Sequence, residues 1–84
     1  MDKKKVGEVE HYYSQLGVAL VNLTAPLHVG ENIAIENALG HAVVQQAVES
    51  MQIGKEKIQE AKAGDSVGLK VSAKVHKGNG VYKI

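Results

Sequence analysis

The feature of this sequence that most constrains its fold is the strict alternation of residue types over Ser66–Val75. The apolar positions of this segment are Val67, Leu69, Val71, Ala73 and Val75, and the positions between them are small, polar or basic. Successive side chains of a β-strand point to opposite faces, so this period of two predicts a strand with one buried and one exposed face. A half-buried strand of this kind is typical of an antiparallel sheet.

Apolar runs separated by turn residues recur along the rest of the chain and predict further strands. The expected strands are Val6–Tyr13, Val18–Leu23, Ile33–Ile35, His41–Ile53, Ser66–Val75 and Val81–Ile84. In the first of these, Val9 is expected on the inner face and Val6 on the opposite face. The run Val18–Leu23 is almost continuously apolar, which indicates a strand covered on both sides or one whose outer face meets a partner.

Two segments leave alternatives open. In His41–Ile53 the apolar phase changes after Val48, which predicts a bend or bulge, although Val44, Val48 and Met51 also fit a helical stripe. Gly54–Ala63 has a helical composition but is short, so we expect a loop with one helical turn, anchored by Ile58.

Composition agrees with a small all-β domain. The chain has 84 residues, three tyrosines as its only aromatic residues and no cysteine, so its core must consist of Val, Ile, Leu and Ala. We expect a basic N-terminal arm over residues 1–5 and one domain, a small β-barrel or β-sandwich, over residues 6–84. No apolar stretch follows the first lysines, so no signal peptide is predicted and a cytoplasmic location is expected.

The cations are unevenly distributed. All ten are lysines, and they gather toward the two ends of the chain, whereas eight of the nine acids lie between residues 6 and 65. The absence of arginine argues against sequence-specific nucleic-acid recognition, but lysines can contact a phosphate backbone. The predicted nucleic-acid-binding residues are Lys3, Lys4, Lys5, Lys70, Lys74, His76, Lys77 and Lys83. The alternative is that lysines on an exposed strand provide solubility and block edge-to-edge pairing.

No pattern in the sequence predicts catalysis. The four histidines, His11, His28, His41 and His76, lack the spacing of metal ligands, and no serine lies in a Gly-x-Ser-x-Gly motif. Glu8 and Glu10 fit a solvated strand face better than an acid–base pair. We therefore expect no catalytic residue, no metal, no cofactor and no enzymatic activity.

Three phrases of the sequence occur in the same order in a known group of barrels. They are Gly7-x-Val9, "LHVGENIAI" at Leu27–Ile35 and "AKAGDSVGLKV" at Ala61–Val71, followed by the closing "KGNGVYKI". With these phrases the chain resembles the second domain of translational GTPases such as elongation factor Tu. It also resembles stand-alone translation elongation factor-like proteins and the C-terminal barrel of collagenase-like peptidases linked to tRNA modification.

The resemblance implies a single six-stranded antiparallel β-barrel in which Gly64 and Asp65 form a turn. No phosphate-binding loop is present, so GTP binding is not implied. The function expected is a non-catalytic module that binds RNA or the translation apparatus, with tRNA or ribosomal RNA as partner and no membrane. The alternative is a protein–protein adaptor that serves a tRNA-modifying or peptidase-like enzyme in trans. Such an adaptor would dock through Val18–Leu23 or through an open barrel edge.

Overall fold

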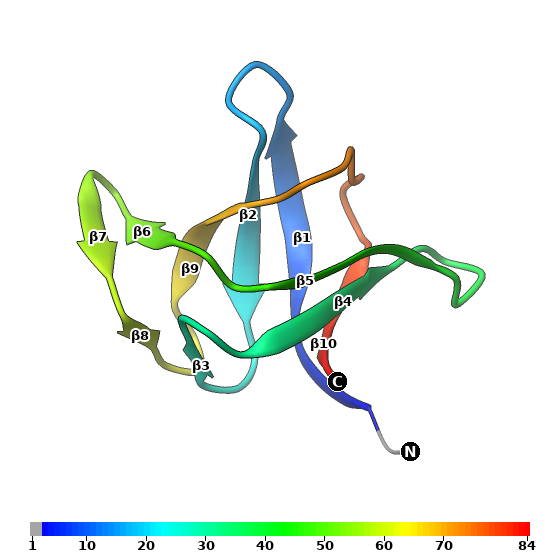
Figure 1. The fold of residues 1–84 in the computed structure, drawn as a ribbon, viewed down its shortest axis with the longest axis horizontal. Helices are drawn as coiled ribbons and strands as arrows, with labels where there is room; N and C mark the ends of the chain where they lie inside the picture. Colours follow the sequence, from blue (N-terminus) through cyan, green and yellow to red (C-terminus); the bar gives the residue numbers. More distant parts are fainter. Residues whose placement is uncertain (1–2) are drawn as a thin grey trace.

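The computed structural model describes residues 3–84, which form ten β-strands and no helix (Figure 1). The longer strands are β1 (Lys4–Tyr13), β2 (Val18–Leu23), β4 (Asn32–Glu36), β5 (Ala42–Ala47), β9 (Ser66–Lys70) and β10 (Gly80–Lys83). The shorter ones are β3 (Leu27–His28), β6 (Met51–Ile53), β7 (Glu56–Ile58) and β8 (Glu60–Ala61). Every pairing is antiparallel, so the predicted all-β antiparallel class is confirmed.

The strands form one large sheet and one small one. Eight strands follow the order β5-β4-β10-β1-β2-β9-β6-β7, and β3 pairs with β8. The large sheet curves around a common interior (Figure 1). Within residues 3–84 no ladder joins the end strands β5 and β7, so the closed six-stranded barrel is not confirmed. No helix in this part of the chain is long and apolar enough to cross a membrane.

The core consists mainly of Val, Ile, Leu and Ala side chains, as the composition predicts, and Met51 is a buried member that this prediction omitted. Its fully buried members are Val6, Val9, Val21, Leu27, Ile33, Ile35, Met51, Val67, Leu69, Val75 and Val81. All of them except Val75 come from strands, and Tyr12 and Ile58 pack against the core. Burying these side chains is the main favourable contribution to folding.

The alternating segment behaves as predicted in burial but not in backbone pairing. Val67, Leu69, Val71 and Val75 are buried, whereas β9 ends at Lys70 and Ala73 is exposed. Beyond Lys70 the chain leaves the ladder, with Val71 N–H donating to Gly17 O at 2.9 Å. The strand predicted over Ser66–Val75 is therefore wrong in its second half, because an apolar period reports burial and not hydrogen bonding.

The strand predicted over His41–Ile53 is divided by the expected bend. β5 ends at Ala47, β6 begins at Met51, and both Val48 and Met51 are buried. The helical alternative is wrong. The helical turn expected within Gly54–Ala63 is also wrong, since β7 and β8 occupy this segment, although Ile58 packs against the core as predicted.

Irregular pairing changes which face of the sheet the side chains of β1 point to. Its register shifts between Lys5 and Gly7 against β10, and between Val9 and His11 against β2. Val6 and Val9 are both buried as a result, so the prediction that they face opposite sides is wrong. A β-bulge explains this outcome, because one extra residue reverses the facing of those that precede it.

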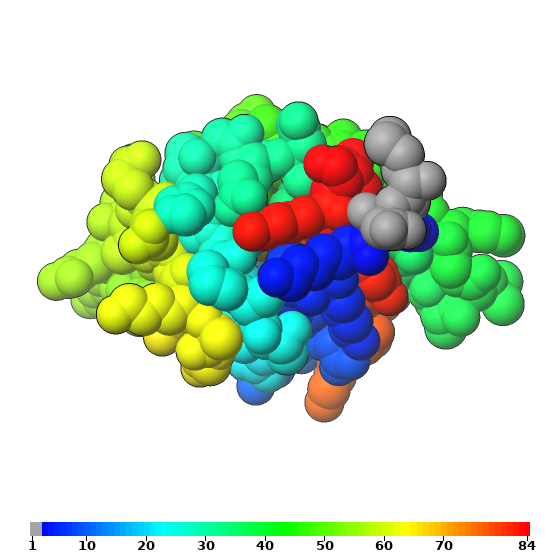
Figure 2. All heavy atoms as spheres, turned by 90° about the horizontal axis from the view of Figure 1, so that it is seen from below, coloured from blue at the N-terminus to red at the C-terminus, as the bar shows by residue number. Residues whose placement is uncertain are grey.

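The first and last strands lie side by side. In the β1–β10 ladder Lys4 is opposite Lys83, and Figure 2 shows the blue N-terminal and red C-terminal segments in contact. Lys4 and Lys5 therefore belong to β1 and not to a separate arm. Met1 and Asp2, which were also assigned to that arm, lie outside the described residues.

The predicted turn at Gly64 and Asp65 is present. Gly64 has a positive φ of 93°, and Asp65 Oδ2 accepts a hydrogen bond from Lys62 N–H at 2.9 Å. The backbone of Asp65 also accepts from Leu23 N–H at 2.8 Å, which ties the turn to the end of β2. In the phrase "AKAGDSVGLKV", Gly64 and Asp65 therefore have a structural role, since the Asp65 side chain accepts a backbone hydrogen bond as in an Asx-type turn.

Candidate functional site

The predicted nucleic-acid-binding residues do not form one patch. Lys4 lies opposite Lys83 at one end of β1, while Lys70 lies opposite Val18 near the other end. At about 3.3 Å per residue, the length of β1 separates these two ends by roughly 30 Å. The structure therefore divides the set into a terminal group, Lys3, Lys4, Lys5 and Lys83, and a loop group, Lys70, Lys74, His76 and Lys77.

Most of the terminal group is already paired with acids. Lys3 forms an ion pair with the buried carboxylate of Glu36, and its Nζ lies 5.4 Å from the ring centroid of Tyr82. Lys5 pairs with Glu8 at 2.7 Å, and Lys83 pairs with Glu31 at 3.1 Å. Lys4 is the one member of this group that makes no ion pair within residues 3–84. Little of the positive charge of the terminal group is therefore left to contact a phosphate backbone.

The side chains of the loop group are exposed and make no ion pair with any described residue. Lys70 Nζ donates to Leu16 O at 3.4 Å, which holds it near the β1–β2 turn. The strand predicted over Ser66–Val75 would place Lys70, Lys74 and His76 along one outward face. This prediction is wrong, since Lys74, His76 and Lys77 follow the end of β9 in the irregular segment 71–79. Their role in nucleic-acid binding stays a prediction.

A charged network lies at the terminal end of the sheet. His28, in β3, contacts Glu60 of the paired strand β8 through Nε2, and its Nδ1 lies 3.4 Å from Glu31. Burial alone would raise the pKa of Glu31, but the backbone N–H of His28 at 2.7 Å and the ammonium of Lys83 outweigh it, so that pKa is lowered. The network ties β3 and β8 to β10.

The Lys5–Glu8 pair shifts both partners in the directions expected for an ion pair. The hydrogen bond with Glu8 raises the pKa of Lys5, and the same bond lowers the pKa of Glu8. Both groups are exposed, so the pair adds little stability. No group of three or more His, Cys, Asp or Glu side chains in the described range is placed to hold a metal ion.

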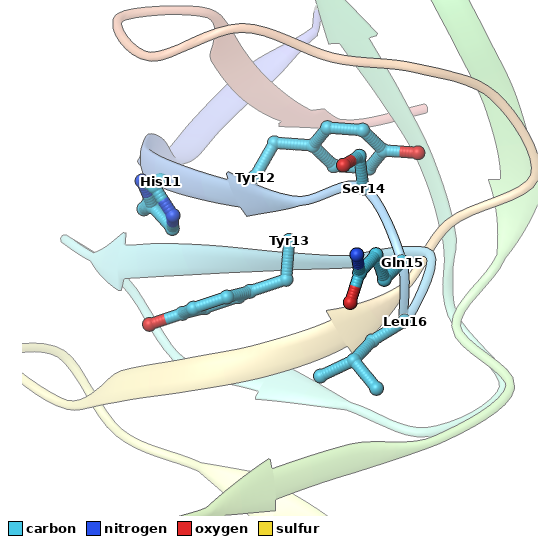
Figure 3. Close-up of a pocket in the computed structure, with 6 residues that line it drawn as sticks. All are labelled: His11, Tyr12, Tyr13, Ser14, Gln15 and Leu16. Atoms are coloured by element: carbon cyan, nitrogen blue, oxygen red, sulfur yellow. The ribbon is translucent and has the colours of Figure 1, made fainter.

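The β1–β2 hairpin carries a hollow of about 430 Å³ formed by six consecutive residues, His11–Leu16 (Figure 3). Tyr12 points to one side of the strand and packs against the core, whereas His11 and Tyr13 point to the other. The rings of His11 and Tyr13 meet edge to face with centroids 4.4 Å apart. This stacking holds Tyr13 in place although its side chain is exposed.

A second hollow, of about 310 Å³, adjoins the first at Tyr13 and Leu16 on the outer face of the sheet. We call it the outer groove, and its principal residues are Tyr13, Leu16, Val18, Leu20, Gln52 and Gly68. The ladder brings them together because Tyr13 lies opposite Val18, Leu20 opposite Gly68, and Gly68 opposite Gln52. Cross-strand partners share one face of a sheet, so these side chains form one surface.

The sequence predicted part of this surface and missed the rest. The apolar run Val18–Leu23 indicated an outer face suited to a partner, and Val18 and Leu20 are indeed half-buried on that face. The contributions of Tyr13, Gln52 and Gly68 depend on the order of strands in the sheet, and no local pattern signals that order.

The chain is similar in sequence to part of one protein that is named as a protease. Over 82 residues, or 95% of its length, the chain is 34% identical to a protein of Methanocaldococcus jannaschii named uncharacterized protease MJ0090. The chain spans only 19% of the length of that relative. No model of a protein family matches the chain.

Solved structures show the same fold in two settings. The C-terminal domain of a Geobacillus thermoleovorans protein described as a U32 peptidase superposes with a TM-score of 0.87, covering 96% of this chain and 92% of that one at 18% identity. GDP-bound aIF5B from Aeropyrum pernix has a TM-score of 0.61 at 11% identity, covering 96% of this chain and 14% of that one. Identities this low show the fold alone.

These findings support one of the predicted resemblances over the others. The likeness to the C-terminal barrel of collagenase-like peptidases is supported by both the sequence relative and the U32 peptidase domain. The likeness to a stand-alone elongation factor-like protein is not supported, and the translational GTPase shares only the fold. None of these similarities supports RNA binding.

Proposed function

We propose that this chain is a non-catalytic adaptor domain that binds a peptidase-like protein in trans. The observation that carries the proposal is the 34% identity, over 95% of this chain, to a segment that makes up 19% of a protein named as a protease. The U32 peptidase domain supports it, because that domain is the C-terminal portion of its protein. A barrel appended to a larger chain is suited to binding and positioning.

We further propose that the sheet functions as a closed six-stranded barrel made of β5, β4, β10, β1, β2 and β9. Its closing contact would be the side chain of Gln46, which donates to Lys70 O at 2.7 Å and accepts from Ser72 N–H at 2.8 Å. A glutamine amide offers the same donor and acceptor as a peptide group. It therefore joins β5 to the chain that follows β9, where no ladder does.

The adaptor proposal is tested by using the tagged chain to capture partners from a native lysate, with and without ribonuclease. We expect a peptidase-like protein among the partners identified by mass spectrometry, and its retention after ribonuclease treatment and at raised salt. Burial of apolar surface depends little on salt, whereas contacts to phosphates weaken steeply as salt rises. Recovery of no such protein would refute the adaptor role.

The same experiment tests the predicted RNA contact. If every partner is lost on ribonuclease treatment, and replacing Lys70, Lys74 and Lys77 by Glu abolishes binding to tRNA at low salt, the chain is an RNA-binding module and the adaptor proposal fails. The lysines of the loop group are the ones to change, because those of the terminal group, Lys4 excepted, are paired with acids.

A further inference from the structure

The outer groove is more apolar than the solvent-facing side of a small sheet requires. Antiparallel sheets with one solvated face normally place polar residues there. In this chain Val18 and Leu20 face outward at the centre of the sheet, and Tyr13 and Leu16 beside them are 42% and 63% exposed. Adjoining exposed apolar side chains of this kind mark interaction sites.

A glycine shapes the floor of the groove. An added Cβ on Gly68 would lie 3.3 Å from Val18 Cγ1 and 3.9 Å from Gln52 O, so a side chain here would occupy the space beside Val18. With glycine in this position the backbone of β9 is open to an incoming group. The hollow therefore runs across β2 and β9 to Gln52 of β6.

Charge indicates what the groove accepts. Lys70 lies opposite Val18 in the β2–β9 ladder, and Lys57 lies opposite Gln52 in the β6–β7 ladder, so both lysines flank the groove on its outer face. Both are exposed, and neither forms an ion pair with a residue of the described range. The cross-strand rows that contain these two lysines, Tyr13–Val18–Lys70 and His11–Leu20–Gly68–Gln52–Lys57, include no acid.

We propose that the outer groove binds a segment of a partner protein that carries apolar side chains and at least one carboxylate. The apolar side chains fill the hollow over Gly68 between Leu16 and Leu20, and the carboxylate meets Lys57 or Lys70. The inference rests on the proposed adaptor function and names the surface and the chemistry of the partner. Complementary charge at the rim provides the specificity, and apolar burial provides the affinity.

The test uses two twelve-residue peptides, one alternating leucine with aspartate and the other leucine with lysine. Each is titrated into the isotope-labelled full chain, and amide chemical shifts are followed by NMR. We expect the acidic peptide to shift the amides of Val18, Leu20 and Gly68 and to leave those of β5 unchanged. The basic peptide should bind at least about fivefold more weakly.

Variants assign the binding to the groove. Leu16→Glu should weaken binding of the acidic peptide about tenfold, because it places a carboxylate where the apolar side chains dock. The matched control is Val43→Glu, since Val43 is also an exposed aliphatic residue but lies on β5, and it should have no effect. Reversing both lysines, Lys57→Glu with Lys70→Glu, should invert the preference so that the basic peptide binds more tightly. A misfolded variant would not show such a gain.

Several outcomes would overturn the proposal: no shift of the groove amides, equal binding of the two peptides, or displacement of the acidic peptide by a twelve-nucleotide uridine RNA. A concentration-dependent dimer that Leu16→Glu abolishes would assign the groove to a second copy of this chain instead.

The groove proposal and the adaptor proposal fail on different results. If a peptidase-like protein is captured equally by wild type and Leu16→Glu, the adaptor role stands and the groove fails. If the acidic peptide binds but no such protein is captured, the groove proposal stands and the adaptor role fails.

Discussion

Gly7 lies so close to Asn22 that a Cβ atom on Gly7 would be 2.6 Å from the carbonyl oxygen of Asn22. The same atom would lie 2.9 Å from Val21 Cγ1, and both Gly7 and Val21 are buried. The close approach occurs where β1 changes register, so the bulge and the glycine belong together.

We therefore expect Gly7→Ala to lower the free energy of unfolding by about 1–3 kcal/mol, because the backbone of β2 cannot yield as a side chain would. The measurement is urea unfolding followed by circular dichroism. Gly68→Ala is the matched control, since the atom nearest to its Cβ would belong to the half-buried side chain of Val18, at 3.3 Å, and its effect should stay below about 1 kcal/mol. Equal losses in the two variants would contradict the steric explanation.

The Gln46 bridge predicts a difference between neighbouring glutamines. Gln46→Ala leaves Lys70 O and Ser72 N–H without their partner and should cost about 1 kcal/mol, with water replacing part of the loss. Gln45→Ala removes an exposed side chain and should change stability by less than about 0.5 kcal/mol. Hydrogen exchange of the Ser72 amide provides a second measurement, and it should accelerate in Gln46→Ala alone. Unchanged exchange would show that the Gln46 bridge does not hold β5 to the chain that follows β9.

The ion pair between Lys3 and Glu36 should stabilise the fold. Glu36 is buried, so Lys3→Ala leaves a carboxylate without its cation and should cost about 1–2 kcal/mol. Lys4→Ala, one residue away on an exposed and unpaired side chain, should have almost no effect. Thermal unfolding distinguishes the two variants. Combining Lys3→Ala with Glu36→Gln should recover part of the loss, and no recovery would show that the two groups do not interact.

Acid should weaken the fold partly through Glu31. Its lowered pKa means that the folded state favours the carboxylate, so the stabilisation is present above the unfolded pKa of about 4.3 and disappears as pH falls through the folded value. Glu31→Gln should flatten the dependence of stability on pH between about pH 5 and 3. The effect is expected to be below about 1 kcal/mol, since the pair is partly exposed. Glu49→Gln, outside any ion pair of the described residues, should leave the pH dependence as in the wild type.

The sequence predicted those parts of the fold that depend on a local period. The run Val18–Leu23 is a strand with the predicted bounds, and the alternation after Ser66 places Val67 and Leu69 in the core. The end of β9 at Lys70 was not predictable, because a strand ends where its ladder partner ends, and that partner lies some 50 residues away at Val18. Short strands such as β3 and β8 carry no period at all.

For the candidate site too, the sequence predicted local features but not those that depend on the order of the strands. Lys70, Lys74 and Lys83 are near in the sequence, but Lys83 lies at the far end of β10 and is paired with Glu31. Only the topology reveals that separation. The outer groove was half predicted, since Val18 and Leu20 stand out in the sequence, whereas Gly68 acquires its meaning only when β9 lies beside β2.

The pairing of Lys4 with Lys83 has a consequence for how this unit combines with others. Because both ends of the described chain leave from one edge of the molecule, the unit can be inserted into a surface loop of a host protein without stretching either connection. Circular permutation should work for the same reason: a short glycine-rich linker would join the ends, and new termini at the exposed 38–40 turn would interrupt no strand. This placement of the two ends suits a unit that matches 19% of one relative in sequence and 14% of another protein in fold.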